Sequence, residues 1–106
     1  MARKAKSAPA TIAFEGDLTI RGIPGAYERL RSALAGGASV LATVAEDAAI
    51  DLTFVQLIEA ARRSARDSGT VFALAAPASG ALLETLRRGG FLETAPHREF
   101  WLLGDN

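Results

Sequence analysis

The sequence contains no cysteine and only one histidine among its 106 residues. The lack of cysteine excludes disulfide bridges, thiolate metal sites and thiol catalysis. It is consistent with a reducing compartment, and we expect a cytoplasmic protein. The one histidine, His97, follows Pro96 in a predicted loop, and there is no second histidine with which to build a metal cluster. We therefore interpret His97 as a surface residue, and we expect no metal site and no cofactor.

Net charge and long apolar runs are also absent. Twelve Lys and Arg residues balance twelve Asp and Glu residues, so the chain has no overall attraction for nucleic acid or an anionic membrane. No apolar run approaches the roughly 20 residues that a bilayer-spanning helix needs, and no signal-peptide core follows the basic N-terminal segment. We expect a flexible basic tail over residues 1–10, a single domain over residues 11–106, no nucleic-acid partner and no membrane insertion.

Apolar residues follow a strand spacing in some segments and a helix spacing in others. The pattern predicts strands over residues 11–14, 18–20, 39–44, 70–75 and 98–103, and helices over residues 23–34, 52–66 and 79–88. Strands that alternate with helices favour parallel pairs with right-handed crossovers. We therefore expect an α/β fold with a single-layer mixed sheet of four to five strands flanked by helices, in the order β-β-α-β-α-β-α-β. The residues expected in its core are Val40, Leu41, Val44, Leu57, Ile58, Phe72, Leu74 and Leu86.

The longest helical pattern begins at Asp51, behind a short acidic loop. Asp51 suits the N-cap position, since its carboxylate can accept hydrogen bonds from the free backbone N–H groups of the first turn. Thr53 lies in that turn, where the N–H groups and the positive end of the helix dipole point outward. A hydroxyl there is well placed to meet a partner or to carry a phosphoryl group. The alternative is a first-turn residue whose hydroxyl bonds Asp51 or water.

Other kinds of chemical site are less consistent with the sequence. We interpret the three acids within residues 46–51 as a solvated loop with an N-cap rather than as a catalytic pair. The glycine pairs follow predicted helices and make no phosphate-binding loop, and no serine occupies a nucleophile elbow. Glu59 and Arg63 stand four residues apart and predict a surface ion pair, while Trp101 is interpreted as a packing residue. We therefore expect a protein that is not an enzyme.

Several motifs taken together resemble the STAS domains, the family named after sulphate transporters and anti-sigma factor antagonists. The resemblance covers residues 11–103 and consists of the element order, the Gly16-Asp17-Leu18 turn, the Asp51-Leu52-Thr53 step and the Gly90-Phe91 step. In the anti-sigma antagonist branch, an Asp-Ser-Ser-Gly or Asp-x-Ser/Thr segment carries the residue that a partner kinase phosphorylates. Thr53 falls on that position, and Asp51 falls on the preceding aspartate.

The sequence departs from this family pattern at three positions. Leu52 replaces the first serine, Phe54 replaces the glycine, and Thr19 stands where the family's Gly-Glu-Leu-Asp motif has its aspartate. With these changes the chain looks like the divergent bacterial STAS proteins that are associated with chemotaxis-type kinases or with the ATPase of lipid ABC transporters.

The resemblance implies two competing functions. In the first, the chain is a signalling module that docks on a histidine-kinase-like ATPase or an anti-sigma factor, and phosphorylation of Thr53 controls the docking. In the second, it is an unmodified subunit that binds the ATPase of a lipid transporter through the same face. A small-ligand binder is a weaker third alternative. The partner-binding residues expected on this face are Asp17, Thr19, Asp47, Asp51, Thr53, Gln56 and Glu59.

Overall fold

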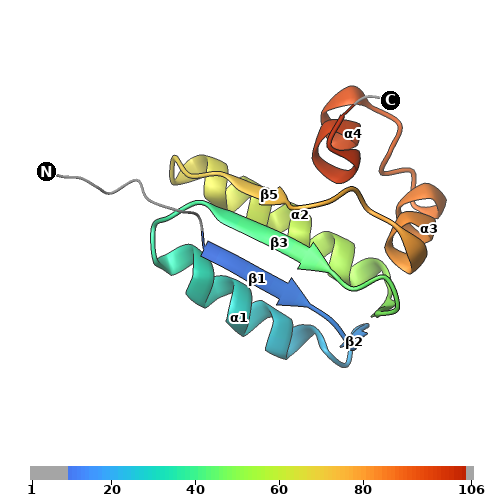
Figure 1. The fold of residues 1–106 in the computed structure, drawn as a ribbon, viewed down its shortest axis with the longest axis horizontal. Helices are drawn as coiled ribbons and strands as arrows, with labels where there is room; N and C mark the ends of the chain where they lie inside the picture. The colour runs from blue at the N-terminus through green and yellow to red at the C-terminus, as the bar shows by residue number, and fades with distance from the viewer. Residues whose placement is uncertain (1–9, 105–106) are drawn as a thin grey trace, which may run out of the picture.

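A computed structural model describes residues 10–104 as an α/β fold in which four helices accompany short parallel strands (Figure 1). The strands are β1 (Ala10–Phe14), β2 (Asp17–Leu18), β3 (Val40–Val44), β4 (Ala49–Ile50) and β5 (Phe72–Leu74). The helices are α1 (Ile23–Ala35), α2 (Leu52–Asp67), α3 (Gly80–Arg88) and α4 (Ala95–Leu102). Residues 1–9 of the expected basic tail, and residues 105–106, lie outside the described part of the chain, whereas Ala10 already belongs to β1.

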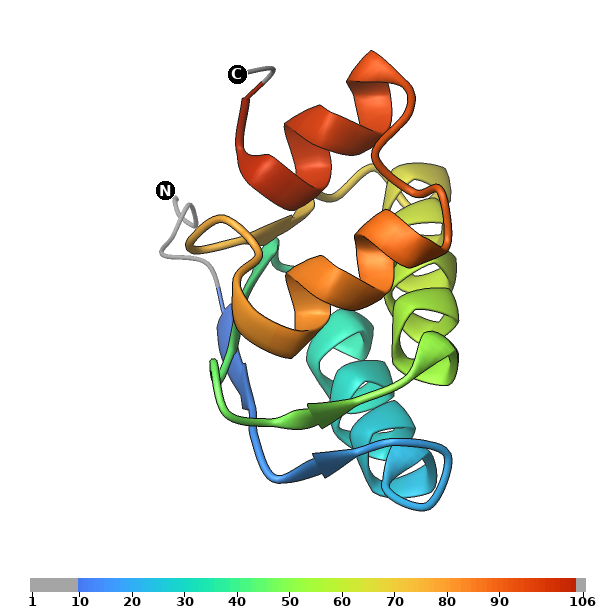
Figure 2. The same ribbon diagram turned by 90° about the vertical axis from the view of Figure 1, so that its right-hand side faces the viewer.

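Three parallel strands form the central sheet, in the order β1-β3-β5. β3 lies in the middle, where Val40 is paired with Ala10 of β1 and with Phe72 of β5. Further along the chain from β1 and β3, the strands β2 and β4 form a second parallel pair, with Asp17 opposite Ala49. The helices α1 and α2 lie side by side against one face of the sheet, where each returns the chain to the start of the next strand (Figure 1, Figure 2).

Alternation along each strand directs every second side chain toward α1 and α2. In β1, Ile12 and Phe14 are buried, while Thr11 and Ala13 are exposed. α2 contributes an apolar stripe to the same core, and its Phe54 meets Phe14 edge to face with the ring centroids 5.3 Å apart. The core also contains Val40, Ala42, Val55, Ile58, Phe72, Leu74, Leu82, Leu86 and Trp101.

The three predicted helices are confirmed, and each of their ends lies within one residue of its predicted position. The predicted sheet is confirmed only in its coarser features. The described strands form a parallel group of three and a separate parallel pair, in the overall order β-β-α-β-β-α-β-α-α, rather than one mixed layer. Most of the expected core is buried, but Leu41, Val44 and Leu57 are only half-buried. Leu41 alternates with two buried neighbours and therefore points away from the helices.

The predicted closing strand over residues 98–103 is wrong, because most of this segment belongs to α4. Pro96 stands in the first turn of α4, where a proline is tolerated since the first N–H groups have no helical acceptor. Phe100 and Trp101 are both buried although they are consecutive, which a helix permits and strand alternation does not. The two rings pack edge to face, and Phe100 also stacks on Phe72 of β5 with centroids 6.0 Å apart.

Candidate functional site

Asp51 follows β4 directly and stands at the N-cap of α2 with an extended backbone. One carboxylate oxygen, Oδ1, accepts a hydrogen bond from the Thr53 N–H at 2.9 Å and another from the Thr53 hydroxyl. The other oxygen, Oδ2, accepts a hydrogen bond from the N–H of Ile20 at 2.9 Å. One side chain therefore caps α2 and also holds a segment that lies 31 residues earlier in the chain.

These hydrogen bonds all favour the ionised form of Asp51. The Thr53 hydroxyl contributes most, and together with the backbone N–H groups of Ile20, Thr53 and Phe54 it holds the pKa of Asp51 below its ordinary value of 3.8, against the opposing effect of burial. At neutral pH the carboxylate is therefore charged and acts as an acceptor. It also lies at the positive end of the α2 dipole. This arrangement suits the positioning of the Thr53 hydroxyl rather than proton donation to a substrate.

The tripeptide Asp-Leu-Thr occurs twice, at residues 17–19 and at residues 51–53, and both copies adopt the same side-chain geometry. In the first copy, Asp17 Oδ1 accepts hydrogen bonds from the Thr19 N–H at 2.9 Å and from the Thr19 hydroxyl. The Thr19 hydroxyl is also the largest cause of a lowered pKa of Asp17. The first copy begins within β2, whereas the second copy follows β4. Because these strands pair in parallel and the Ile20 N–H binds Asp51, the two copies lie side by side.

The two copies differ in the burial of their leucines. Leu18 is 3% exposed and belongs to the core, whereas Leu52 is 44% exposed. Ile20, whose N–H binds Asp51, is 67% exposed. Sequence reasoning missed both exposed apolar side chains, because it assigned Leu52 to the predicted helix 52–66 and Ile20 to the predicted strand 18–20 without determining which side of each element faces the core. The repeated tripeptide is the sequence signal that could have indicated two equivalent turns.

The structure brings together four of the seven predicted partner-binding residues, namely Asp17, Thr19, Asp51 and Thr53. Asp47 is exposed in the connection between β3 and β4, which turns through a hydrogen bond from the Ala48 N–H to the Ala45 carbonyl. Gln56 is exposed one turn into α2. It borders a surface hollow of about 320 Å³ whose other lining residues are Glu59, Arg63, Phe91 and His97.

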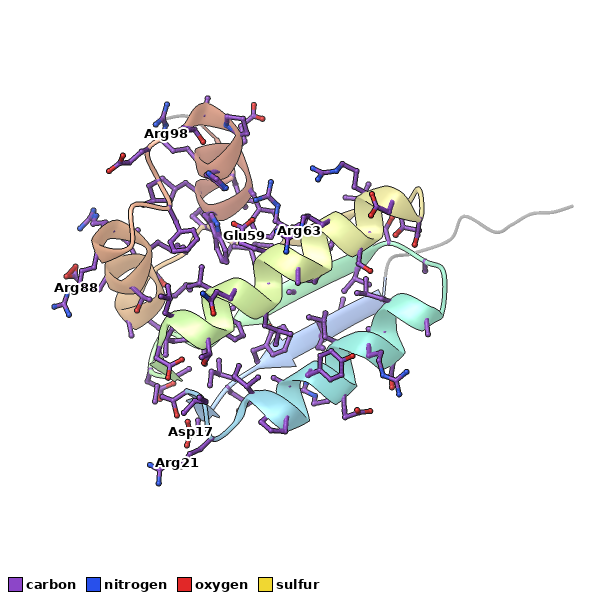
Figure 3. The ribbon with its side chains drawn as sticks, turned by 180° about the vertical axis from the view of Figure 1, so that it is seen from behind. Asp17, Arg21, Glu59, Arg63, Arg88 and Arg98 are labelled. Carbon is purple, nitrogen blue, oxygen red and sulfur yellow. The ribbon has the colours of Figure 1, made fainter. Side chains whose placement is uncertain are left out.

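Glu59 does not share the exposed position that was predicted for it. Its side chain is 15% exposed, and its carboxylate accepts a hydrogen bond from the indole N–H of Trp101 at 2.9 Å. Its ion-pair partner is Arg62 at 3.1 Å rather than Arg63, and the Nε2 atom of His97 lies 3.8 Å from it. Figure 3 shows Glu59 on α2 facing the C-terminal helices, far along the molecule from Asp17. Glu59 therefore joins α4 to α2, and it lies apart from the four residues that the structure brings together.

Arg62 completes this contact between α2 and α4. Its guanidinium carbon lies 4.3 Å from the centroid of the Phe100 ring, and the Arg62 side chain is 21% exposed. His97 is half-buried rather than fully exposed, and its Nδ1 atom lies 3.0 Å from the Thr94 hydroxyl. Aromatic and cationic side chains from α2 and α4 thus lie around the Glu59 carboxylate, which fits a structural role.

Within residues 10–104, no group of three or more His, Asp and Glu side chains is placed so that it could hold a metal ion. In the same part of the chain, none of the helices combines the length and the apolarity that a membrane span requires.

Comparison with known proteins yields no relative from which a function could be transferred: no family model, no curated protein and no solved structure matches the chain.

Proposed function

We propose that this chain is a non-enzymatic, STAS-type signalling module that docks on an ATP-binding protein of the histidine-kinase or anti-sigma class. The docking surface comprises the loop 45–53, the first turns of α2 and the adjoining segment 15–20, and phosphorylation of Thr53 controls the docking. The observation that carries the proposal is the Asp51 carboxylate, which holds the Thr53 hydroxyl and the Ile20 N–H at the first turn of α2. A modification of that hydroxyl acts on both segments at once.

A phosphoryl group on Thr53 would oppose this arrangement in two ways. It replaces the hydroxyl proton that is donated to Asp51, and it adds about 1.5 to 2 negative charges next to a carboxylate that is already ionised. The dipole of α2 favours the new anion, by about 0.3–1 kcal/mol at an exposed site, so the fold is retained. At an interface the balance changes, because a dianion buried without a matching cation costs several kcal/mol (about 3–5 for an unpaired buried charge). Phosphorylation therefore releases the partner.

A second candidate function is an unmodified subunit that binds the ATPase of a lipid ABC transporter through the same surface. One observation favours it: the Thr53 hydroxyl is half-buried and already bound to Asp51, while the neighbouring Leu52 side chain is exposed. A partner could therefore use this surface without any modification of Thr53.

Phosphorylation is tested by incubating the chain with ATP and a histidine-kinase-like ATPase as the candidate partner, and by measuring the intact mass of the product. Thr19→Ala is the matched control for Thr53→Ala, since both hydroxyls donate to the aspartate two residues earlier. We expect one added phosphate on the wild type and on Thr19→Ala, and none on Thr53→Ala. An unmodified wild type would refute the switch.

Docking is tested by the affinity of that ATPase for variants of the surface. We expect Thr53→Glu, Asp47→Ala and Gln56→Ala to weaken binding, with a loss of about tenfold or more for Thr53→Glu, which is about 1.4 kcal/mol. Arg87→Ala and Arg88→Ala, at the exposed end of α3, serve as controls and should leave the affinity unchanged. Equal losses on both surfaces would show that the docking surface is assigned wrongly. Full binding by Thr53→Glu, without phosphorylation of the wild type, would favour the unmodified subunit.

A further inference from the structure

Two large apolar side chains are exposed to solvent near the start of α2. Ile20 is 67% exposed and Leu52 is 44% exposed, and the hydrogen bond from the Ile20 N–H to Asp51 places both at the same corner of the molecule. Single exposed apolar residues are ordinary on protein surfaces, so exposure alone decides nothing. These two are distinguished by the polar contacts that fix the backbone beneath them.

Those contacts hold the apolar side chains away from the core. Strand alternation from Leu18 would direct Ile20 inward, but the Asp17–Thr19 turn and the hydrogen bond from the Gly22 N–H to the Thr19 carbonyl end the strand first. At Gly22 a side chain would collide with this turn, since a Cβ atom there would lie 1.7 Å from the Asp17 carbonyl oxygen. The corner formed by Ile20 and Leu52 is therefore a fixed feature of the fold rather than a loose loop.

Acidic residues are frequent in the two segments that form this corner. Residues 14–22 and 44–53 contain the acids Glu15, Asp17, Glu46, Asp47 and Asp51, with Arg21 as the single basic residue in these two segments. The two segments are neighbours in space, because the Ala45 N–H donates to the Phe14 carbonyl at 2.8 Å and the Ala49 N–H donates to the Gly16 carbonyl at 2.9 Å. Arg21 neutralises little, since its side chain is 87% exposed and lies 3.9 Å from the Asp17 carboxylate.

We infer that Ile20 and Leu52 form the apolar anchor of the docking surface and that the partner offers an apolar cleft with a basic rim. The inference rests on the proposed function for the use of this surface in docking, and it adds the chemistry of the partner. An apolar centre within a charged rim is the usual anatomy of a specific interface. A second copy of this chain does not fit, because a twofold contact would set one acidic rim against the other.

Peptide selection tests the chemistry without knowledge of the natural partner. A random library of peptides about 12 residues long is displayed on phage and selected on the wild-type chain at low salt. We expect the enriched peptides to combine at least two large apolar residues with a net positive charge. Their affinity should fall about tenfold for Ile20→Ser and about tenfold for Leu52→Ser. Added salt should weaken them further, since it screens the acidic rim.

The chain offers closely matched controls for both substitutions. Val71 is 61% exposed and Leu103 is 45% exposed, which compares with 67% for Ile20 and 44% for Leu52. We expect Val71→Ser and Leu103→Ser to leave peptide affinity within about twofold, which corresponds to about 0.4 kcal/mol. Far-ultraviolet circular dichroism of all four variants confirms that each is folded.

The inference is overturned by peptides that lack a net positive charge, by peptides that bind Ile20→Ser and Leu52→Ser at full strength, or by a selection that enriches none. Its failure is distinguishable from failure of the proposed function. If the selected peptides still bind Thr53→Glu and no kinase phosphorylates the wild type, the apolar anchor is kept and the phosphorylation switch is refuted. If Thr53→Glu loses affinity for the ATP-binding partner while Ile20→Ser and Leu52→Ser retain it, the switch is kept and the anchor is refuted.

Discussion

Replacement of Asp51 by alanine tests the central contact of the candidate site. The substitution removes the N-cap of α2 and the acceptor of the Ile20 N–H in one step. Loss of an aspartate N-cap costs about 1 kcal/mol in a typical helix, and one further hydrogen bond contributes about 1 kcal/mol net. Since Asp51 is partly exposed and water can replace some of these contacts, we expect a total loss of about 1.5–2 kcal/mol in the free energy of unfolding.

Asp17→Ala is the matched control for this prediction. Asp17 accepts the same two hydrogen bonds from a threonine two residues later, but it caps no helix and holds no distant segment. We therefore expect Asp17→Ala to cost less than half of the Asp51→Ala loss. Urea unfolding at pH 7, followed by far-ultraviolet circular dichroism, measures both. Equal losses for the two variants would refute the distinct role of Asp51.

The pH dependence supplies an independent check on the same contact. The pKa of Asp51 is lower in the folded chain than its ordinary value of 3.8, so the folded state favours the ionised carboxylate. This contribution is fully present above pH 3.8 and is lost as the pH falls through the lowered pKa. The difference in stability between the wild type and Asp51→Ala should therefore be constant from pH 7 to about pH 5 and shrink below pH 3.8. A difference that stays constant at low pH would contradict the role of charge.

Two further predictions concern packing. Phe72→Ala should lower the free energy of unfolding by about 3–5 kcal/mol, since Phe72 is 6% exposed and stacks on Phe100. Urea unfolding measures this loss, with Val71→Ala at the exposed neighbouring position as the control. A loss below about 1 kcal/mol would contradict the assigned register. Trp101→Phe keeps an aromatic ring but removes the N–H donated to Glu59, and should cost about 1–2 kcal/mol in the wild type. The cost should be clearly less in Glu59→Ala, which has no acceptor for that N–H; strict additivity of the two substitutions would argue against the Glu59–Trp101 contact.

Local information was sufficient to predict the helices and most of the core. The stripe of Phe54, Ile58 and Ala61, the N-cap at Asp51 and the glycines after α1 all act within a few residues of one another. The last element could not be assigned in this way. Its apolar run is short enough to fit a strand or a helix, and what decides between them is the packing of Phe100 and Trp101 against distant parts of the fold.

The same distinction between local and distant contacts explains which parts of the site were predictable. The bonds from Thr53 to Asp51 span two residues, and the alternative reading of Thr53 as a first-turn residue bonded to Asp51 anticipated them. The bond from Ile20 to Asp51 spans 31 residues, and the bond from Trp101 to Glu59 spans 42. No spacing rule within a helix predicts such contacts. Helical periodicity could place Glu59 outside the apolar stripe, but it could not show that α4 covers that position.

Under the proposed docking function, the positions of these two distant contacts separate docking from stability along a single helix. Asp51 fixes the start of α2, where Ile20 and Leu52 are exposed, while Glu59 lies farther along α2 and is covered by Trp101 of α4. Because Ile20 and Leu52 are exposed to solvent, replacing their side chains removes little buried apolar area. Substitutions at this corner should therefore change partner affinity. Because Glu59 and Trp101 bind each other and contribute no side chain to the corner, changes there should act on stability. On the proposed function, substitutions at residues 20 and 52 should therefore change partner affinity without destabilising the fold.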